Sequence, residues 1–163
     1  MNPTSSNKFK EIINNPLKYK LFTITRLPMA WLAGLRVVDL SEQSAAVTIY
    51  YGYLTQNPFK SIYFACLAMA AELSTGVLAM MHVYEAKPSV SMLVTGLKAE
   101  FHKKAVGKIT FTCTDGNAIA TAIAESKATG EGRTVAARSI GTDESGVIVA
   151  DFTFVWSFKA KKA

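Results

Sequence analysis

The chain has 163 residues, of which 50% are apolar and 18% are charged, and it carries a formal net charge of +6. This length fits a single domain over residues 1–163, and the low charge content excludes a disordered chain. The surplus of apolar residues favours an oligomer or a lipid-facing element, because it exceeds what one small domain readily covers. The positive charge is compatible with an anionic partner but does not specify one.

The N-terminal segment mixes Asn, Ser and Lys with isolated apolar residues, and it lacks the continuous apolar stretch of a secretory signal. We therefore expect a cytoplasmic protein. Apolar residues at helical spacing between Lys8 and Tyr19, interrupted by Pro16, predict a short helix. This helix belongs to an N-terminal helical extension over residues 1–30 of the domain.

Two short strands, 35–40 and 45–51, are predicted next, and the polar turn between them indicates a hairpin. The run 62–81 is long and apolar enough to cross a membrane, but it has Glu72 at its middle. An acidic residue near a bilayer centre is costly, and the rest of the chain has the alternation of a soluble sheet. We therefore expect a buried central helix and no membrane span.

The second half of the chain is predicted to consist mainly of strands. Residues 90–102 and 107–114 alternate between apolar and polar positions, and we expect these two strands to pair with each other. A short helix over 115–127 follows, and then a hairpin formed by 134–141 and 147–159. Together these elements predict an α+β fold in which an antiparallel β-sheet wraps around a long central helix.

Metal, disulfide and nucleic-acid sites are not expected. Cys66 and Cys113 have no further Cys and no nearby His at metal-ligand spacing. The sequence has no phosphate-binding Gly-Lys-Ser/Thr loop and no Gly-x-Ser-x-Gly elbow. Its basic residues are dispersed and match no recognised module, so nucleic acid is not an expected partner.

One face of the long helix carries small residues around Glu72. At about 100° per residue, Thr75 and Gly76 share this face, where a helix, a strand or a narrow acyl chain could approach closely. A carboxylate among Ala, Leu and Met should have a raised pKa, which suits a general base. The residues alone leave open that Glu72 instead faces solvent or pairs with Arg133 or Arg138 in the sheet.

The segment from Asn57 to Gly76 resembles the loop and central helix of hotdog-fold acyl-CoA thioesterases. More narrowly, it is similar to a branch of that superfamily described only as domains of unassigned function. The motif of the family has an amide, a histidine, two glycines and, nine residues after the histidine, an acid. In this chain those positions are occupied by Asn57, Tyr63, Phe64, Ala65 and Glu72. The resemblance extends over most of the chain, from about residue 35 to residue 158.

The resemblance implies a hotdog fold and hydrolysis of an acyl thioester with Glu72 as the general base or nucleophile. It implies that the backbone N–H of Ala65, with that of Phe64, forms the oxyanion hole, and that Asn57 orients the water or the carbonyl. Thr75 and Gly76 are then neighbours of the bound substrate, and the catalytic residues that the resemblance implies are Glu72, Asn57 and Tyr63.

The resemblance also implies a homo-oligomer, a dimer or a tetramer. The site would lie between two subunits, with Glu72 of one chain facing Asn57 and Tyr63 of the other. No cofactor and no metal are implied, and coenzyme A enters only as part of the substrate.

Two other functions stay open on the same fold. In a non-catalytic acyl- or lipid-binding protein, Tyr63 and Phe64 would close the site to water, and the Tyr63 ring would simply pack at the start of the helix. An acyl-thioester dehydratase is the third possibility, although its site centres on a histidine. Both histidines of this chain, His82 and His102, lie outside the motif.

Overall fold

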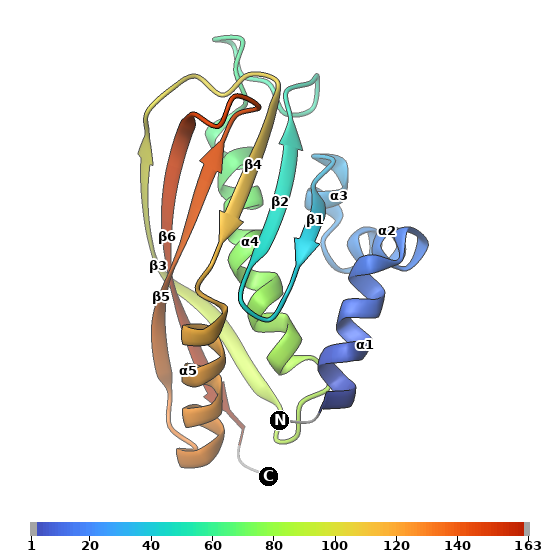
Figure 1. Cartoon of the computed structure of the whole chain (residues 1–163), viewed down its shortest axis with the longest axis vertical. Helices are drawn as coiled ribbons and strands as arrows, with labels where there is room; N and C mark the ends of the chain where they lie inside the picture. Colours follow the sequence, from blue (N-terminus) through green and yellow to red (C-terminus); the bar gives the residue numbers. More distant parts are fainter. Residues whose placement is uncertain (1–2, 162–163) are drawn as a thin grey trace.

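Six antiparallel strands form one sheet that curves around a long helix (Figure 1). The computed structural model describes residues 3–161 of the chain. The strands are β1 (Arg36–Leu40), β2 (Ala45–Tyr50), β3 (Val90–Phe101), β4 (Lys108–Cys113), β5 (Arg133–Thr142) and β6 (Ile148–Ala160). The helices are α1 (Pro3–Asn14), α2 (Pro16–Arg26), α3 (Pro28–Leu32), α4 (Phe64–Val83) and α5 (Gly116–Thr129). This arrangement confirms the predicted α+β architecture of a sheet around a central helix.

Alternation along the strands gives the sheet one buried face, which packs on α4. The buried positions of β6 include Phe152, Phe154, Trp156 and Phe158. In β4, Ile109, Phe111 and Cys113 are fully buried, whereas the polar positions between them are only half-buried. The period of two predicted for these strands is confirmed, and the core lies between the sheet and α4.

The predicted pairing of strands 90–102 and 107–114 is wrong. In the described chain β3 pairs with β6, and β4 lies between β2 and β5. The backbone after β3 is committed elsewhere, since the N–H of His102 donates to Val149 at 2.8 Å and the carbonyl of Ala105 accepts from Ile62 at 2.8 Å. The connection therefore runs over the end of the sheet to β4 (Figure 1), and the β5–β6 hairpin takes the place beside β3.

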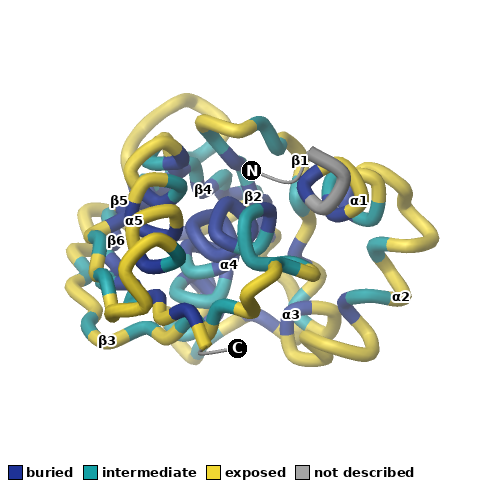
Figure 2. The backbone as a smooth tube through the Cα atoms, turned by 90° about the horizontal axis from the view of Figure 1, so that it is seen from below, coloured by how far each residue is buried: buried dark blue, intermediate teal, exposed yellow. Residues whose placement is uncertain are grey.

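Helix α4 carries apolar residues on every side, and it is covered by the sheet on one side and by α1 on part of the other. Its most apolar 18-residue window has a mean hydropathy of 1.7, and 67% of that window is buried. The sheet covers one side, where Ser74 Oγ and Ser139 Oγ form a hydrogen bond of 2.7 Å. Helix α1 packs on part of the opposite side (Figure 2). Among residues 3–161 only α4 has the length and composition of a membrane span, and its burial identifies it as a core helix.

Three helices form the N-terminal segment in place of the single short helix predicted over 8–19. The sequence suggested that Pro16 breaks a helix, but this proline begins α2. The side chain of Asn15 caps α2, because its Oδ1 accepts from the N–H groups of Leu17 at 3.0 Å and Lys18 at 3.1 Å. Proline is favourable in a first turn, where its missing N–H leaves no partner unsatisfied, and Pro28 opens α3 in the same way.

Helix α5 begins in direct contact with the turn between β1 and β2. A Cβ at Gly116 would lie 2.2 Å from the backbone oxygen of Glu42 and 2.8 Å from Cα of Gln43. We expect Gly116→Ala to lower the free energy of unfolding by about 1–3 kcal/mol in urea denaturation, because the two backbones must move apart. Gly132→Ala is the matched control, since its Cβ would meet nothing within 4 Å. An equal loss in both variants would contradict this close contact.

Candidate active site

The loop before α4 is held together by Asn57. Its Oδ1 accepts hydrogen bonds from the backbone N–H groups of Phe59 at 2.9 Å and Ser61 at 3.3 Å, and its Nδ2 lies 3.1 Å from Ser61 Oγ. The Asn57 N–H also donates to the Ser61 carbonyl at 2.9 Å. An amide nitrogen has two hydrogens, so Nδ2 keeps one for a further acceptor. Asn57 therefore shapes the loop and can still offer one donor to a ligand.

The N-terminus of α4 presents backbone N–H groups without internal partners. Tyr63 is the N-cap residue, with extended backbone angles of φ −62° and ψ 134°, and its side chain makes no capping hydrogen bond. The N–H groups of Phe64 and Ala65 have no acceptor within the helix, and they donate to no other backbone or side-chain acceptor in residues 3–161. These donors stand at the positive end of the helix dipole, where they can stabilise a developing oxyanion.

Aromatic rings connect this end of α4 to the sheet. The ring centroids lie 5.0 Å apart between Tyr63 and Phe64, 6.4 Å between Phe64 and Phe101, and 5.5 Å between Phe101 and Phe152. Phe152 is buried, but Tyr63, Phe64 and Phe101 are 47%, 56% and 51% exposed. The outer rings therefore form an apolar surface at the N-terminus of α4.

A hollow of about 550 Å³ lies next to this loop and has ammonium groups on one side. Lys103 and Lys104 line it together with Asn57. The Lys104 Nζ donates to the carbonyl of Phe59 at 3.3 Å, and the Lys103 Nζ pairs with a carboxylate oxygen of Asp143 at 2.7 Å. Lys104 pairs with no carboxylate among the described residues, so it can offer positive charge to an anionic part of a ligand.

Glu72 lies in the middle of α4 on the floor of a second hollow, of about 490 Å³. Three aromatic side chains line it: Phe9 lies 6.0 Å from Phe22 and 5.5 Å from Tyr84 between ring centroids. Arg26 lines the hollow as well and carries its one positive charge among the described residues. The other lining side chains are apolar, so Glu72 faces a largely apolar space.

Burial raises the pKa of Glu72 above its ordinary value of 4.5, through the loss of water around the carboxylate. Within residues 3–161 the carboxylate forms no ion pair and no side-chain hydrogen bond. The alternatives that it pairs with Arg133 or Arg138 are wrong, because Arg133 pairs with Glu125 and Arg138 binds Asp151. The carboxylate is therefore both desolvated and available.

Thr75 and Gly76 shape the surface of α4 beside Glu72. Thr75 is fully buried, and its Oγ1 donates to the carbonyl of Glu72 at 2.9 Å and accepts from Nε1 of Trp156 at 2.9 Å. A Cβ at Gly76 would lie 3.5 Å from Oε1 of Glu72 and 3.6 Å from the Trp156 ring. Thr75 thus ties α4 to β6, whereas Gly76 leaves space around the carboxylate.

The predicted site residues fall into two groups within one chain. Asn57, Tyr63 and Phe64 line the hollow at the start of α4, whereas Glu72 and Gly76 line the hollow at its middle. The nine residues from Tyr63 to Glu72 correspond to roughly 13.5 Å along a helix. One chain therefore does not bring the two groups together.

Residues 18–157 match the family model of a domain of unknown function, DUF4442. The chain belongs to the DUF4442 family. No curated protein matches the sequence. The family match includes α4 and every strand except the last three residues of β6, and it leaves α1 and the first two residues of α2 outside.

Solved structures show that the fold of this DUF4442 protein is the hotdog fold. A Pseudomonas aeruginosa protein of unknown function, described as a probable thioesterase, is 19% identical with a TM-score of 0.75, over 90% of this chain and 97% of its own. A thioesterase from Haemophilus influenzae is 13% identical with a TM-score of 0.66, over 86% and 88%. The PaaI protein of E. coli, from a phenylacetic acid degradation operon, is 12% identical with a TM-score of 0.63, over 86% and 89%. The resemblance in fold expected from the helix motif is therefore confirmed.

The N-terminal helices supply a wall of the Glu72 hollow that the sequence analysis of this DUF4442 protein missed. Phe9 comes from α1, Phe22 and Arg26 come from α2, and Leu27 follows α2 directly. No motif marks these residues, and their apolar spacing predicts only that a helix packs on the domain. Their position beside Glu72 follows from the packing of α1 on α4 and of α2 on α1.

The cysteines and His82 are poorly placed to act in this site. Burial raises the pKa of the Cys113 thiol to about 11 and also raises that of Cys66, so both thiols stay protonated near neutral pH. Burial lowers the pKa of His82, which lies ten residues after Glu72 or roughly 15 Å along α4. In the described part of the chain no group of three or more His, Cys, Asp or Glu could hold a metal ion.

The raised pKa of Glu72 predicts a pH-dependent cost in stability. Between the ordinary pKa and the raised one, the folded protein holds a proton that the unfolded chain has released, so stability falls as the pH rises through this range. In urea denaturation we expect the free energy of unfolding of Glu72→Gln to exceed that of the wild type increasingly as the pH rises. The difference should be smallest below pH 4.5, the ordinary value. A difference that does not change with pH would contradict the desolvation of Glu72.

Proposed function

We propose that this protein hydrolyses an acyl thioester of coenzyme A, with Glu72 as the general base or nucleophile. The observation that carries the proposal is the Glu72 carboxylate, which lies in an apolar hollow and has no ion-pair partner among the described residues. A carboxylate desolvated in this way acquires the raised pKa that general-base catalysis near neutral pH requires. The thioesterase among the structural relatives has the same fold, which adds support.

As a general base, Glu72 takes a proton from a water molecule while the oxygen of that water attacks the thioester carbonyl. The carbonyl oxygen becomes an oxyanion, which the backbone N–H groups of Phe64 and Ala65 from the other chain of a dimer stabilise. The carbon–sulfur bond then breaks, and the thiol leaves with the proton that Glu72 held. As a nucleophile, the Glu72 carboxylate instead attacks the carbonyl and expels the thiolate, and water hydrolyses the resulting anhydride.

The two hollows suit the two ends of such a substrate. The acyl group fits beside Glu72, where Phe22 and Tyr84 offer apolar contact worth about 0.8 kcal/mol for each methylene buried. The phosphates of coenzyme A fit beside Lys103 and Lys104 in the hollow at the start of α4. An uncharged fatty or aromatic acyl group is the class that the Glu72 hollow favours.

Two copies of the chain are needed to join the two groups of site residues. β3 is an edge strand, and its Leu97 and Phe101 side chains are 56% and 51% exposed. We infer a twofold contact that covers this edge and sets Glu72 of one chain opposite Asn57 and Tyr63 of the other. Asn57 then orients the water or the carbonyl with its remaining hydrogen, and the Tyr63 hydroxyl lies close to the reacting group.

Loss of the carboxylate tests the chemistry. We expect Glu72→Gln to lower kcat for hydrolysis of an acyl-CoA panel about 10²- to 10⁴-fold, because Gln cannot accept the proton. Release of free thiol measures the rate, and binding of the same acyl-CoA measured in parallel should change little. Glu125→Gln, which removes a carboxylate on α5 far from both hollows, is the matched control and should retain the wild-type rate.

Two outcomes would contradict this function. Full activity of Glu72→Gln would remove Glu72 from the mechanism. A wild type that binds short, long and aromatic acyl groups but hydrolyses none of them would favour the alternative, a non-catalytic acyl-binding protein of the same fold.

Disruption of the β3 edge tests the shared site. We expect Phe101→Glu to convert the oligomer into a monomer in light scattering, because it places a charge in the apolar contact, and to lower hydrolysis in parallel with the mass. Val38→Glu on β1, at the opposite edge of the sheet, is the control with a similarly exposed side chain, 57% against 51%. A wild type that is monomeric and fully active would exclude the shared site.

A further inference from the structure

Helices α2 and α3 carry an apolar surface that the described chain leaves uncovered. This α2–α3 surface consists of Leu17, Leu21, Ile24, Met29, Trp31 and Leu32, which are 39% to 78% exposed. The first three recur at helical spacing and therefore share one face of α2. Both helices stand at the side of the molecule away from α5 (Figure 1), and they are exposed along most of their length (Figure 2).

The segment that carries this surface contains only positive charge. Between Glu11 and Asp39 the sequence has four Lys and Arg residues and no Asp or Glu. On α2, Lys18 and Lys20 flank the apolar face on its two sides. Lys18 pairs with Glu11, but Lys20 forms no ion pair with any described residue.

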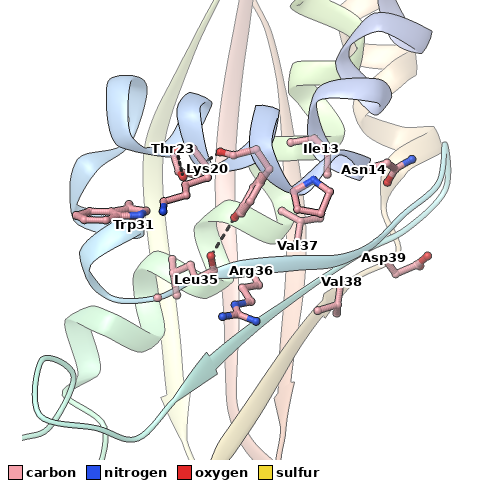
Figure 3. A pocket seen from close by; sticks show the side chains of 13 residues that line it. Ile13, Asn14, Lys20, Thr23, Trp31, Leu35, Arg36, Val37, Val38 and Asp39 are labelled. Atoms are coloured by element: carbon pink, nitrogen blue, oxygen red, sulfur yellow. Dashed lines mark hydrogen bonds between the residues drawn. The ribbon is translucent and has the colours of Figure 1, made fainter.

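The inner side of α2 faces β1 across a hollow, and the apolar face of α2 lies on the other side of the helix. The Tyr19 hydroxyl donates to the carbonyl of Leu35 at 3.0 Å and fixes the inner side of α2 above β1 (Figure 3). The hollow between these elements measures about 660 Å³, and Lys20, Trp31 and Arg36 line it. Cationic and aromatic side chains therefore lie beside the apolar face, whose Leu17 and Leu21 are 78% and 64% exposed among the described residues.

The charge pattern distinguishes between the possible occupants of this surface. A twofold contact of the α2–α3 surface with a second copy would oppose two segments that have cations and no acids, and like charges would repel. An anionic lipid layer offers the complementary charge together with an apolar interior. Trp31 suits the boundary between the two, because its ring is amphipathic and belongs at the level of the headgroups.

The geometry points to docking of the α2–α3 surface on an anionic lipid bilayer. Leu17, Leu21 and Met29 enter the acyl region, and Lys18 and Lys20 lie beside the lipid phosphates. The opposite side of α2 lines the Glu72 hollow through Phe22 and Arg26, so the docked protein would hold this hollow close to the bilayer. The inference rests on the exposed surface and its charge, and it does not depend on the proposed hydrolysis.

Vesicle binding by the full-length chain tests this docking. We expect co-sedimentation with vesicles of phosphatidylcholine and phosphatidylglycerol, weaker binding to phosphatidylcholine alone, and a fall in binding as salt is added. Leu21→Glu should weaken binding to the anionic vesicles at least about tenfold, because it replaces an inserted side chain with a negative charge. Leu54→Glu is the matched control, since Leu54 is 65% exposed against 64% for Leu21 but lies in the loop after β2.

Three results would overturn the inference. The first is an absence of binding to the anionic vesicles, and the second is an equal loss of binding in Leu21→Glu and Leu54→Glu. The third is a fall in the oligomeric mass of Leu21→Glu in light scattering, which would identify the surface as a contact between copies of the chain. As a control for folding, each variant has to give the circular dichroism spectrum and the unfolding midpoint of the wild type.

Discussion

The burial of α4 is the constraint on which the rest of the structure depends. Apolar residues occur on every face of this 20-residue helix, so water has to be excluded from most of its surface. The sheet covers one side with the alternating apolar face of β4 and β6. A sheet that curves around a helix covers only part of its circumference, and α1 packs on part of the remainder. The hollow at Glu72 is the stretch of α4 that neither cover fills.

Glu72 occupies that hollow at a cost in the stability of the folded protein, and contacts of the neighbouring residues hold this turn of α4 in place. The raised pKa expresses the cost, since an ionised carboxylate has lost water and gained no partner among the described residues. The hydrogen bond between Thr75 and Trp156 ties this turn of α4 to β6, and Gly76 gives the carboxylate room. An uncharged side chain at this position would avoid that cost.

Helix α2 links the two surfaces that bear on function. Its inner side contributes Phe22 and Arg26 to the Glu72 hollow, and its outer side presents Leu17 and Leu21. The N-terminal helices, which sequence patterns suggest only as a covering extension, thus form one wall of the Glu72 hollow.

Local pattern was enough to predict the α+β class, the central helix, the buried faces of β4 and β6, and the raised pKa of Glu72. Each of these follows from the periodicity of neighbouring residues or from the apolar side chains around one charge. The tertiary structure alone decided that β3 pairs with β6, that Phe22 and Arg26 lie opposite Glu72, and that Asn57 and Tyr63 lie apart from Glu72 within a chain. These features depend on which distant surfaces meet. The hydrogen-bond partners of backbone groups in 102–105, for example, are Val149 and Ile62, which lie more than 40 residues away along the chain.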